Sequence, residues 1–284
     1  YPDRGTPSLL LENWSRNNPY WSPYSETINS PYQITYNPNS VYAGEDFLGD
    51  VKSILDVYRP DLILYPHPDD VHGDHWALGA FTRLAASMLE RENQDYRPDL
   101  YAYLVHRRDY PEPKRYQPTL NLLPPRRSYE IDSNWYRWDL SESDVALKDQ
   151  AVRQYESQLT TLGNLIYRFV RQNEPYAKPQ PSKQVRLEKG DSNNPDTWQD
   201  NQGLGIEPVQ LDPNRDFITR EMVGEADLVA LYAARNDENH LLLCARFREE
   251  TDDILNYSLQ AIEIGSAGIL HHHASNHNVL GGWH

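Results

Sequence analysis

The chain has 284 residues, enough for one large domain or for a medium domain with a smaller partner, and we expect two domains. Its 42 Asp and Glu residues against 27 Lys and Arg residues give a formal net charge of −15. Nucleic acid and anionic membrane surfaces are therefore poor candidates for a partner, because phosphate binding starts from a positive patch. No run of eighteen apolar residues occurs, so the sequence predicts no membrane span.

The amino terminus and the single cysteine add two expectations. The first residue is Tyr1 rather than methionine, and YPDRGT lacks the regions of a signal peptide, so we expect the chain to begin inside a larger gene product or after a removed segment. Cys244 lies between apolar neighbours in LLLCARFR and is expected to be a buried thiol of the core. One cysteine excludes a disulfide within the chain and leaves the cellular compartment undetermined.

The first 43 residues are rich in Tyr, Pro, Asn, Ser and Trp, with repeated turn signals and no sustained period. Because disordered segments contain few aromatic residues, we expect residues 1–43 to form a long ordered loop over a surface or a cleft. The Tyr and Trp side chains of residues 14–42 could stack on sugars, or they could simply pack the loop.

A helix, a strand, a loop and a second helix are predicted next. Apolar residues follow at helical spacing over 44–59, where Pro60 ends the helix. LILY at 62–65 has the length of a buried strand, and helical spacing resumes over about 77–90. This order is typical of a parallel α/β sheet, in which sites collect at the carboxyl ends of the strands.

Two further elements are expected before residue 176. YLVH at 103–106 is expected to be the next strand of the sheet. Heptad repeats predict one long helix over about 142–172, which begins with a capping box of Ser141 and Asp144 and ends at NEP, residues 173–175.

The remainder of the chain changes character. Residues 177–206 are polar and rich in Pro, Asn, Asp and Gly, which indicates a linker. Period-two patterns in LLLCARFR (241–248) and ILNYSLQA (254–261), with a turn at 236–239, predict a β-meander. The tail, residues 265–284, fits neither pattern, and we expect it to be irregular. Its four histidines are expected to have no function: His271, His272, His273 and His277.

The stretch HPDDVHGDH, residues 67–75, places three histidines and three aspartates on the loop after the strand at 62–65. His72 and His75 lie on one face if the helix begins near Gly73, so they could hold a divalent ion together. Alternatively, one histidine could bind the metal while the other acts as acid, base or oxyanion stabiliser, with an aspartate fixing its tautomer. The start of the helix would add partial positive charge where an oxyanion forms.

Ordinary structural roles compete with these interpretations. Asp-Asp and Gly-Asp near a helix start are common capping and turn residues. The position of H-x-x-H after a buried strand of a parallel sheet nevertheless favours a functional site. His106, at the end of its own predicted strand, could point into the same site or could be structural.

The segment LILYPHPDDVHGDHWALGAF resembles the second motif of the LmbE-like, or PIG-L, family of zinc-dependent N-deacetylases, whose core is D-x-H-x-D-H after a strand. YPDRG, SPY and GEDFLGDV before the motif, and YLVHRRDYP, KDQAVRQYESQ and RFVRQNEPY after it, extend the resemblance from Tyr1 to about Tyr176. The resemblance implies a Rossmann-like parallel sheet, a zinc ion, and removal of an N-acetyl group from an N-acetylglucosamine-type sugar or glycoconjugate.

The resemblance also implies a role for four residues of the motif. His75 would be a zinc ligand, and His72 would polarise the amide or stabilise the tetrahedral oxyanion. Asp74 would orient His72, and Asp70 would face the substrate.

The sequence departs from the family in one respect, because the first motif, A-H-P-D-D-E, lies upstream of the YPDRG landmark and is not found here. That motif supplies two other zinc ligands and the general base. PHPDD at 66–70 imitates it, which would make His67 and Asp70 ligands and Asp69 the base. The neighbouring landmarks place these residues in the second motif instead, and Val71 stands where the first motif has Glu.

We therefore expect an α/β protein with an N-terminally incomplete LmbE-like domain at 1–176, a linker at 177–206, a small β-rich accessory domain at 207–264 and an irregular tail at 265–284. The expected function is zinc-dependent N-deacetylation, with another divalent ion as an alternative and with a possible partner chain that completes the site. The competing hypothesis is a noncatalytic, carbohydrate-binding or structural protein built on a truncated deacetylase fold.

Overall fold

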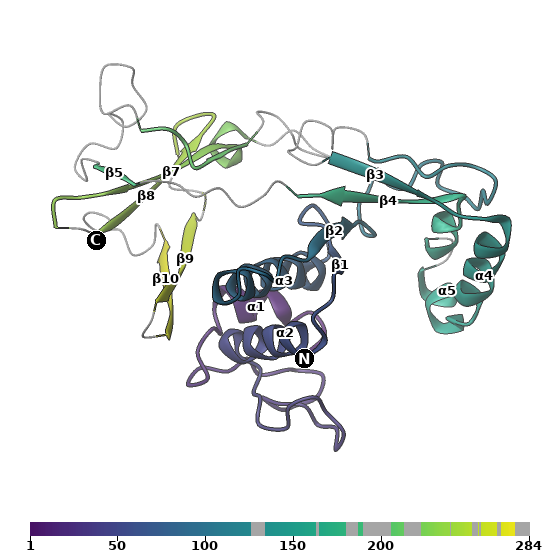
Figure 1. Ribbon diagram of the computed structural model, residues 1–284, viewed down its shortest axis with the longest axis horizontal. Coiled ribbons are helices and arrows are strands. Elements are labelled where there is room, and N and C mark those ends of the chain that lie inside the picture. Colours follow the sequence, from purple (N-terminus) through teal and green to yellow (C-terminus); the bar gives the residue numbers. More distant parts are fainter. Residues whose placement is uncertain are drawn as a thin grey trace. The chain divides into compact units, whose positions relative to one another are not determined.

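The first 180 residues of the computed structural model contain both helices and strands, in the order in which Figure 1 colours them. The elements are α1 (Thr6–Leu11), α2 (Gly44–Tyr58), β1 (Leu62–Pro66), α3 (Gly73–Glu92), β2 (Asp99–Tyr103), β3 (Asn134–Asp139), α4 (Glu142–Arg153), α5 (Glu156–Leu162), η1 (Ile166–Phe169) and β4 (Asn173–Lys178). The predicted helix, strand and helix between residues 44 and 90 are confirmed as α2, β1 and α3.

The chain forms two compact units, Tyr1–Gln180 and Pro181–His284. The structure describes all residues except 126–133, 163–164, 180–186, 190–205, 213–222, 239, 252–254, 256, 266–267 and 276–284. Most of the expected linker at 177–206 lies outside the described residues, so it stays a prediction. Among the helices of the described part, none is long and apolar enough to cross a membrane.

The sheet of the first unit has the strand order β1-β2-β4-β3. β1 and β2 are parallel, with Leu62 opposite Asp99 and Pro66 opposite Tyr103. β4 is antiparallel to both β2 and β3. The mixed α/β class is thus confirmed, but the sheet is mixed rather than parallel throughout.

Helices α1, α2 and α3 pack together beside β1 (Figure 1). The end of α2 follows the predicted stop signal: Arg59 takes a left-handed conformation with φ 45° immediately before Pro60. Gly79 lets α3 approach β1 closely, because a Cβ atom at that position would lie 2.5 Å from the carbonyl oxygen of Pro66. This packing fixes where the loop between β1 and α3 emerges.

The prediction of one long helix over 142–172 is wrong. The capping box of Ser141 and Asp144 is present and begins α4, but α4 ends at Arg153, and the NEP segment belongs to β4. None of the described residues of α4 is buried, and a helix gains most of its stability from burying an apolar face. The buried Asn173 side chain also exchanges hydrogen bonds with both backbone groups of Leu122, which draws this part of the chain into the sheet.

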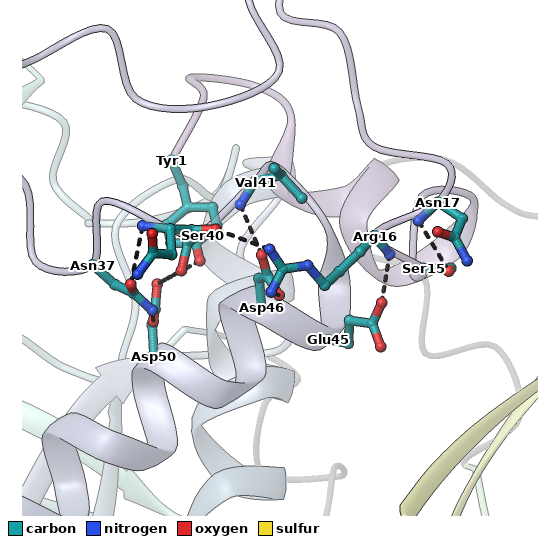
Figure 2. A network of polar contacts seen from close by, with 11 residues as sticks. Tyr1, Ser15, Arg16, Asn17, Asn37, Ser40, Val41, Glu45, Asp46 and Asp50 are labelled. Carbon is teal, nitrogen blue, oxygen red and sulfur yellow. Dashed lines mark hydrogen bonds and ion pairs between the residues drawn. The ribbon is translucent and has the colours of Figure 1, made fainter.

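The aromatic segment at the amino terminus is ordered, as expected, but it contains α1 and several turns. Figure 2 shows how its ends are held against α2: the Tyr1 hydroxyl (2.6 Å), the Ser40 hydroxyl (2.8 Å) and the Asn37 amide (2.9 Å) all donate to the Asp50 carboxylate. Burial raises the pKa of Tyr1, so this hydroxyl stays a donor. The segment is therefore anchored through polar contacts as well as through the buried rings of Trp14 and Tyr42.

The second unit contains mainly strands: β5 (Glu188–Lys189), β6 (Gln210–Leu211), η3 (Gly224–Ala226), β7 (Leu228–Arg235), β8 (Leu241–Phe247), β9 (Ser258–Gly265) and β10 (Gly268–Ser275). β7 and β8 are antiparallel and lie on either side of the turn predicted at 236–239. Cys244 packs against a core cluster around Tyr232 and Leu242, but it is only partly buried, in contrast to the expectation.

The expected end of the meander and the expected irregular tail both need correction. β9 begins at Ser258 rather than near residue 254, and it pairs with β10 instead of β8. β10 carries the backbone of His271, His272 and His273 within the expected irregular tail, since backbone pairing with β9 requires no apolar alternation. His277 lies outside the described residues.

Candidate metal-binding site

Motif residues 67–72 occupy the loop between the carboxyl end of β1 and the start of α3, beside the end of β2, and residues 73–75 begin α3 (Figure 1). Sites in α/β sheets collect at this edge. His67 still belongs to the end of the parallel pair, because its N–H donates to the carbonyl of Tyr103 at 2.8 Å. Beyond His67 the chain turns and reaches His72, which precedes the first residue of α3, as the spacing predicted.

Asp70 is the centre of this loop. Its side chain is fully buried, and Oδ1 accepts the N–H of His72 at 2.9 Å. Oδ2 accepts the backbone N–H groups of Val105 (3.1 Å) and His106 (3.0 Å) and lies 3.0 Å from Nδ1 of His75. Burial opposes ionisation, but these hydrogen bonds outweigh it and lower the pKa of Asp70. Asp70 therefore holds an internal, anchoring position, and the substrate-facing role that the resemblance implied stays a prediction.

The strand predicted at 103–106 is wrong, because β2 covers Asp99–Tyr103 and ends where the prediction began, and the same contacts explain why. The N–H groups of residues 105 and 106 turn to the Asp70 carboxylate instead of continuing the ladder. The carbonyl of His106 accepts the N–H of Val71 at 2.8 Å, so the ends of β1 and β2 are tied to each other.

Three imidazoles meet above this anchor, and we call His72, His75 and His106 the histidine cluster. Their ring centroids lie 4.8 Å apart for His72 and His75, 5.0 Å for His75 and His106, and 5.3 Å for His72 and His106. The ring of His106 thus lies beside the motif. Of the two interpretations of this residue, its position matches the one in which it points into the site.

The protonation of the cluster follows from its partners. An ionised carboxylate only accepts hydrogen bonds, so Nδ1 of His75 must carry the hydrogen that Asp70 receives. The hydrogen bond to Asp70 raises the pKa of His75, whereas burial lowers the pKa of His106. Nδ1 of His72 is buried and makes no hydrogen bond within the described part of the chain.

Asp74 is tied to the amino-terminal segment. Its Oδ2 accepts the N–H of Arg4 at 2.7 Å, and its Oδ1 accepts the N–H of Thr6 at 3.0 Å. These bonds bring Asp3 to the motif, and ligand atoms of Asp3, His72 and Asp74 all lie within 4.8 Å of one another. This group could hold a metal ion. Sequence reasoning missed Asp3, and no spacing pattern connects it to the motif.

His67 and Asp69 have structural partners. The His67 ring is buried, stacks on Trp135 with centroids 5.5 Å apart, and accepts the N–H of Asp69 at its Nδ1. Burial lowers the pKa of His67. Asp69 lies 3.3 Å from Nη1 of the buried Arg107, which also contacts Asp109. In the alternative assignment, His67 and Asp70 would bind the metal and Asp69 would act as the base. All three side chains instead pack against or bind other residues of the protein.

An apolar cavity of about 280 Å³ reaches the same end of the sheet. Val105 lines it, while the N–H of Val105 donates to Asp70. Its other walls are Leu64, Tyr103, Leu104, Tyr110, Leu122, Phe169, Glu174, Pro175 and Tyr176.

No protein-family model matches the chain, and no curated protein matches it.

Proposed function

We propose that the chain carries part of the active site of a zinc-dependent hydrolase that removes the N-acetyl group from an N-acetylglucosamine-type sugar or glycoconjugate. In this proposal residues 1–176 are an incomplete LmbE-like domain with a Rossmann-like sheet, followed by an accessory β-domain. The observation that carries the proposal is the bond between the buried Asp70 carboxylate and Nδ1 of His75 at the end of a parallel strand.

This bond fits a metal-binding histidine. Such histidines usually donate their second ring N–H to a carboxylate or carbonyl, which fixes the tautomer and leaves the other nitrogen as the ligand. Here Asp70 holds Nδ1 of His75 and leaves Nε2 available. A divalent ion bound at this nitrogen would supply Lewis acidity and lower the pKa of a bound water toward about 7.

The neighbouring residues would act on the substrate carbonyl. His72, with its ring 4.8 Å from that of His75, would polarise the amide carbonyl or donate to its oxygen as negative charge develops. The start of α3 directly after His72 adds partial positive charge at the same place. Asp74 would keep the amino-terminal segment, and with it Asp3, beside His72.

The site as described supplies one well-oriented imidazole ligand and a polarising histidine. In this proposal the proton acceptor for the attacking water comes from a partner chain. The aromatic walls of the neighbouring cavity, such as Tyr103 and Tyr176, would suit the apolar face of a sugar ring.

Elemental analysis of the purified chain, with His75→Ala beside it, tests the proposal. We expect roughly stoichiometric zinc that disappears in the variant. His240→Ala is the matched control, because this histidine is exposed in the second unit and should leave the metal content unchanged. A metal-loaded chain is then assayed for acetate release from N-acetylglucosamine conjugates. Absence of bound metal in the parent chain, or zinc retained by His75→Ala, would overturn the assignment.

The second candidate function is noncatalytic carbohydrate binding. It is favoured by the exposed aromatic rings of the amino-terminal segment, among them Trp21, Tyr24 and Tyr32. Titration calorimetry of the metal-free chain with N-acetylglucosamine oligomers distinguishes the candidates. Binding that survives His75→Ala and is lost in Trp21→Ala would favour the noncatalytic function.

A further inference from the structure

We propose that His106 is a second imidazole ligand of the ion that His75 would hold, so that the ends of β1 and β2 each contribute one ligand. The inference rests on the proposed metal-binding role of His75. It extends that role to a residue outside the motif, 31 positions farther along the chain.

The first support is the spacing of the two rings. Their centroids are 5.0 Å apart, with the ring planes tilted by 46°. With a metal–nitrogen bond of about 2.1 Å and a near-tetrahedral angle, two imidazoles that share one zinc ion have centroids about 5 Å apart. The rings of His75 and His106 therefore already have the separation that a shared ion requires.

The second support is that one atom positions both residues. Oδ2 of Asp70 accepts Nδ1–H of His75 and the backbone N–H of His106, each at 3.0 Å. The carbonyl of His106 is fixed in turn by the N–H of Val71 at 2.8 Å. Because Asp70 is fully buried and one oxygen holds both groups, the ring of His75 and the backbone of His106 are fixed relative to each other.

The third support is the freedom left to the His106 side chain. Both described hydrogen bonds of this residue use its backbone, and the ring is partly exposed at the mouth of the cluster. By contrast, His67 on the same edge is buried against Trp135 and uses Nδ1 within its own loop. Of His67 and His106, therefore, only His106 can turn a ring nitrogen toward an ion beside His75.

The group of Asp3, His72 and Asp74 offers an ion a different set of ligands. The two assignments share the cluster but make opposite predictions. An ion held by His75 and His106 depends on His106 and tolerates loss of the Asp3 carboxylate, whereas an ion held by the Asp3 group does the reverse.

The test uses the full chain and measures Zn²⁺ affinity by competition with a chromophoric chelator, together with the absorption spectrum of bound Co²⁺. The compared variants are His106→Ala, His75→Ala, Asp3→Asn and the control His240→Ala. We expect His106→Ala to weaken Zn²⁺ binding at least about 10- to 100-fold and to change the Co²⁺ spectrum. Asp3→Asn and His240→Ala should bind as the parent chain does.

The outcomes separate the inference from the proposed function. Parent-like affinity and spectrum in His106→Ala, combined with loss of binding in His75→Ala, would overturn the inference and leave the proposed function standing. Loss of binding in Asp3→Asn but not in His106→Ala would also overturn it. A parent chain that binds neither ion would overturn both. His106→Asn is the second variant should His106→Ala fail to fold, since both retain the backbone bonds of residue 106.

Discussion

Replacing Asp70 should destabilise the first unit more than any surface substitution, because its buried carboxylate serves three backbone donors and one imidazole. In Asp70→Ala the N–H groups of His72, Val105 and His106 lose their acceptor. A buried donor without a partner costs about 1–3 kcal/mol, and partial entry of water reduces the sum, so we expect a loss of roughly 3–6 kcal/mol. Total stabilities are about 5–15 kcal/mol, so this loss approaches complete unfolding.

Asp70→Asn should have an intermediate effect. Its amide oxygen can replace Oδ2 and keep two backbone donors, but the amide nitrogen then faces the N–H of His72 where Oδ1 accepted it. One unsatisfied donor predicts a loss of about 1–3 kcal/mol. Asp139→Asn is the matched control, since its exposed ion pair with Arg137 should contribute less than about 1 kcal/mol.

Urea unfolding followed by circular dichroism measures these differences, and the order of midpoints should be parent and Asp139→Asn, then Asp70→Asn, then Asp70→Ala. Asp70→Ala with a midpoint equal to that of the parent chain would show that the carboxylate does not anchor the loop. The reasoning behind the orientation of His75 and His106 would then be lost as well, because both depend on the same oxygen.

Two other substitutions test the packing and capping that the structure shows. Gly79→Ala should lower the free energy of unfolding by about 1–3 kcal/mol in urea titrations, because the added Cβ must push the Pro66 carbonyl away from α3. Ser141→Ala removes the side chain that accepts the N–H of Asp144 and should reduce the helical stability of α4 by about 1 kcal/mol. Faster hydrogen exchange confined to α4 would confirm the second effect, and exchange rates equal to those of the parent chain would contradict it.

Local signals predicted the elements that support the site. Apolar spacing and the stop at Pro60 predicted α2, and an apolar run and resumed spacing predicted β1 and α3. The agreement is best for α3, which buries most of the residues that the spacing marks, whereas the strand expected to be buried, β1, leaves Leu62 and Leu64 exposed. The same reasoning failed over 142–172, where the heptad pattern is present but α4 buries none of its described residues. Periodicity states which face could be buried, and tertiary contacts decide whether it is.

The composition of the site was predictable only in part. The motif named His72, His75, Asp70 and Asp74, because their residue types and spacing are local properties of the sequence. The roles of these four residues were less predictable. Asp70, for example, points inward and accepts backbone N–H groups of the segment that follows β2. The sequence offered His106 as one of two possibilities, and a backbone bond to Asp70 brings it to the motif. Asp3 comes to the motif because the backbone N–H of Arg4 donates to Asp74, and no pattern in residue type records such a bond.

The arrangement assigns different tasks to the two aspartates that flank His72. The buried carboxylate of Asp70 binds the His75 ring and the backbone that follows β2, whereas the carboxylate of Asp74 binds the amino-terminal segment. In the sequence, His72 therefore stands between two carboxylates that hold separate parts of the chain. Each aspartate brings one further potential ligand close to His72: Asp70 brings His106, and Asp74 brings Asp3. Full burial and four hydrogen bonds make Asp70 the better organised anchor, which supports the proposed ion between His75 and His106.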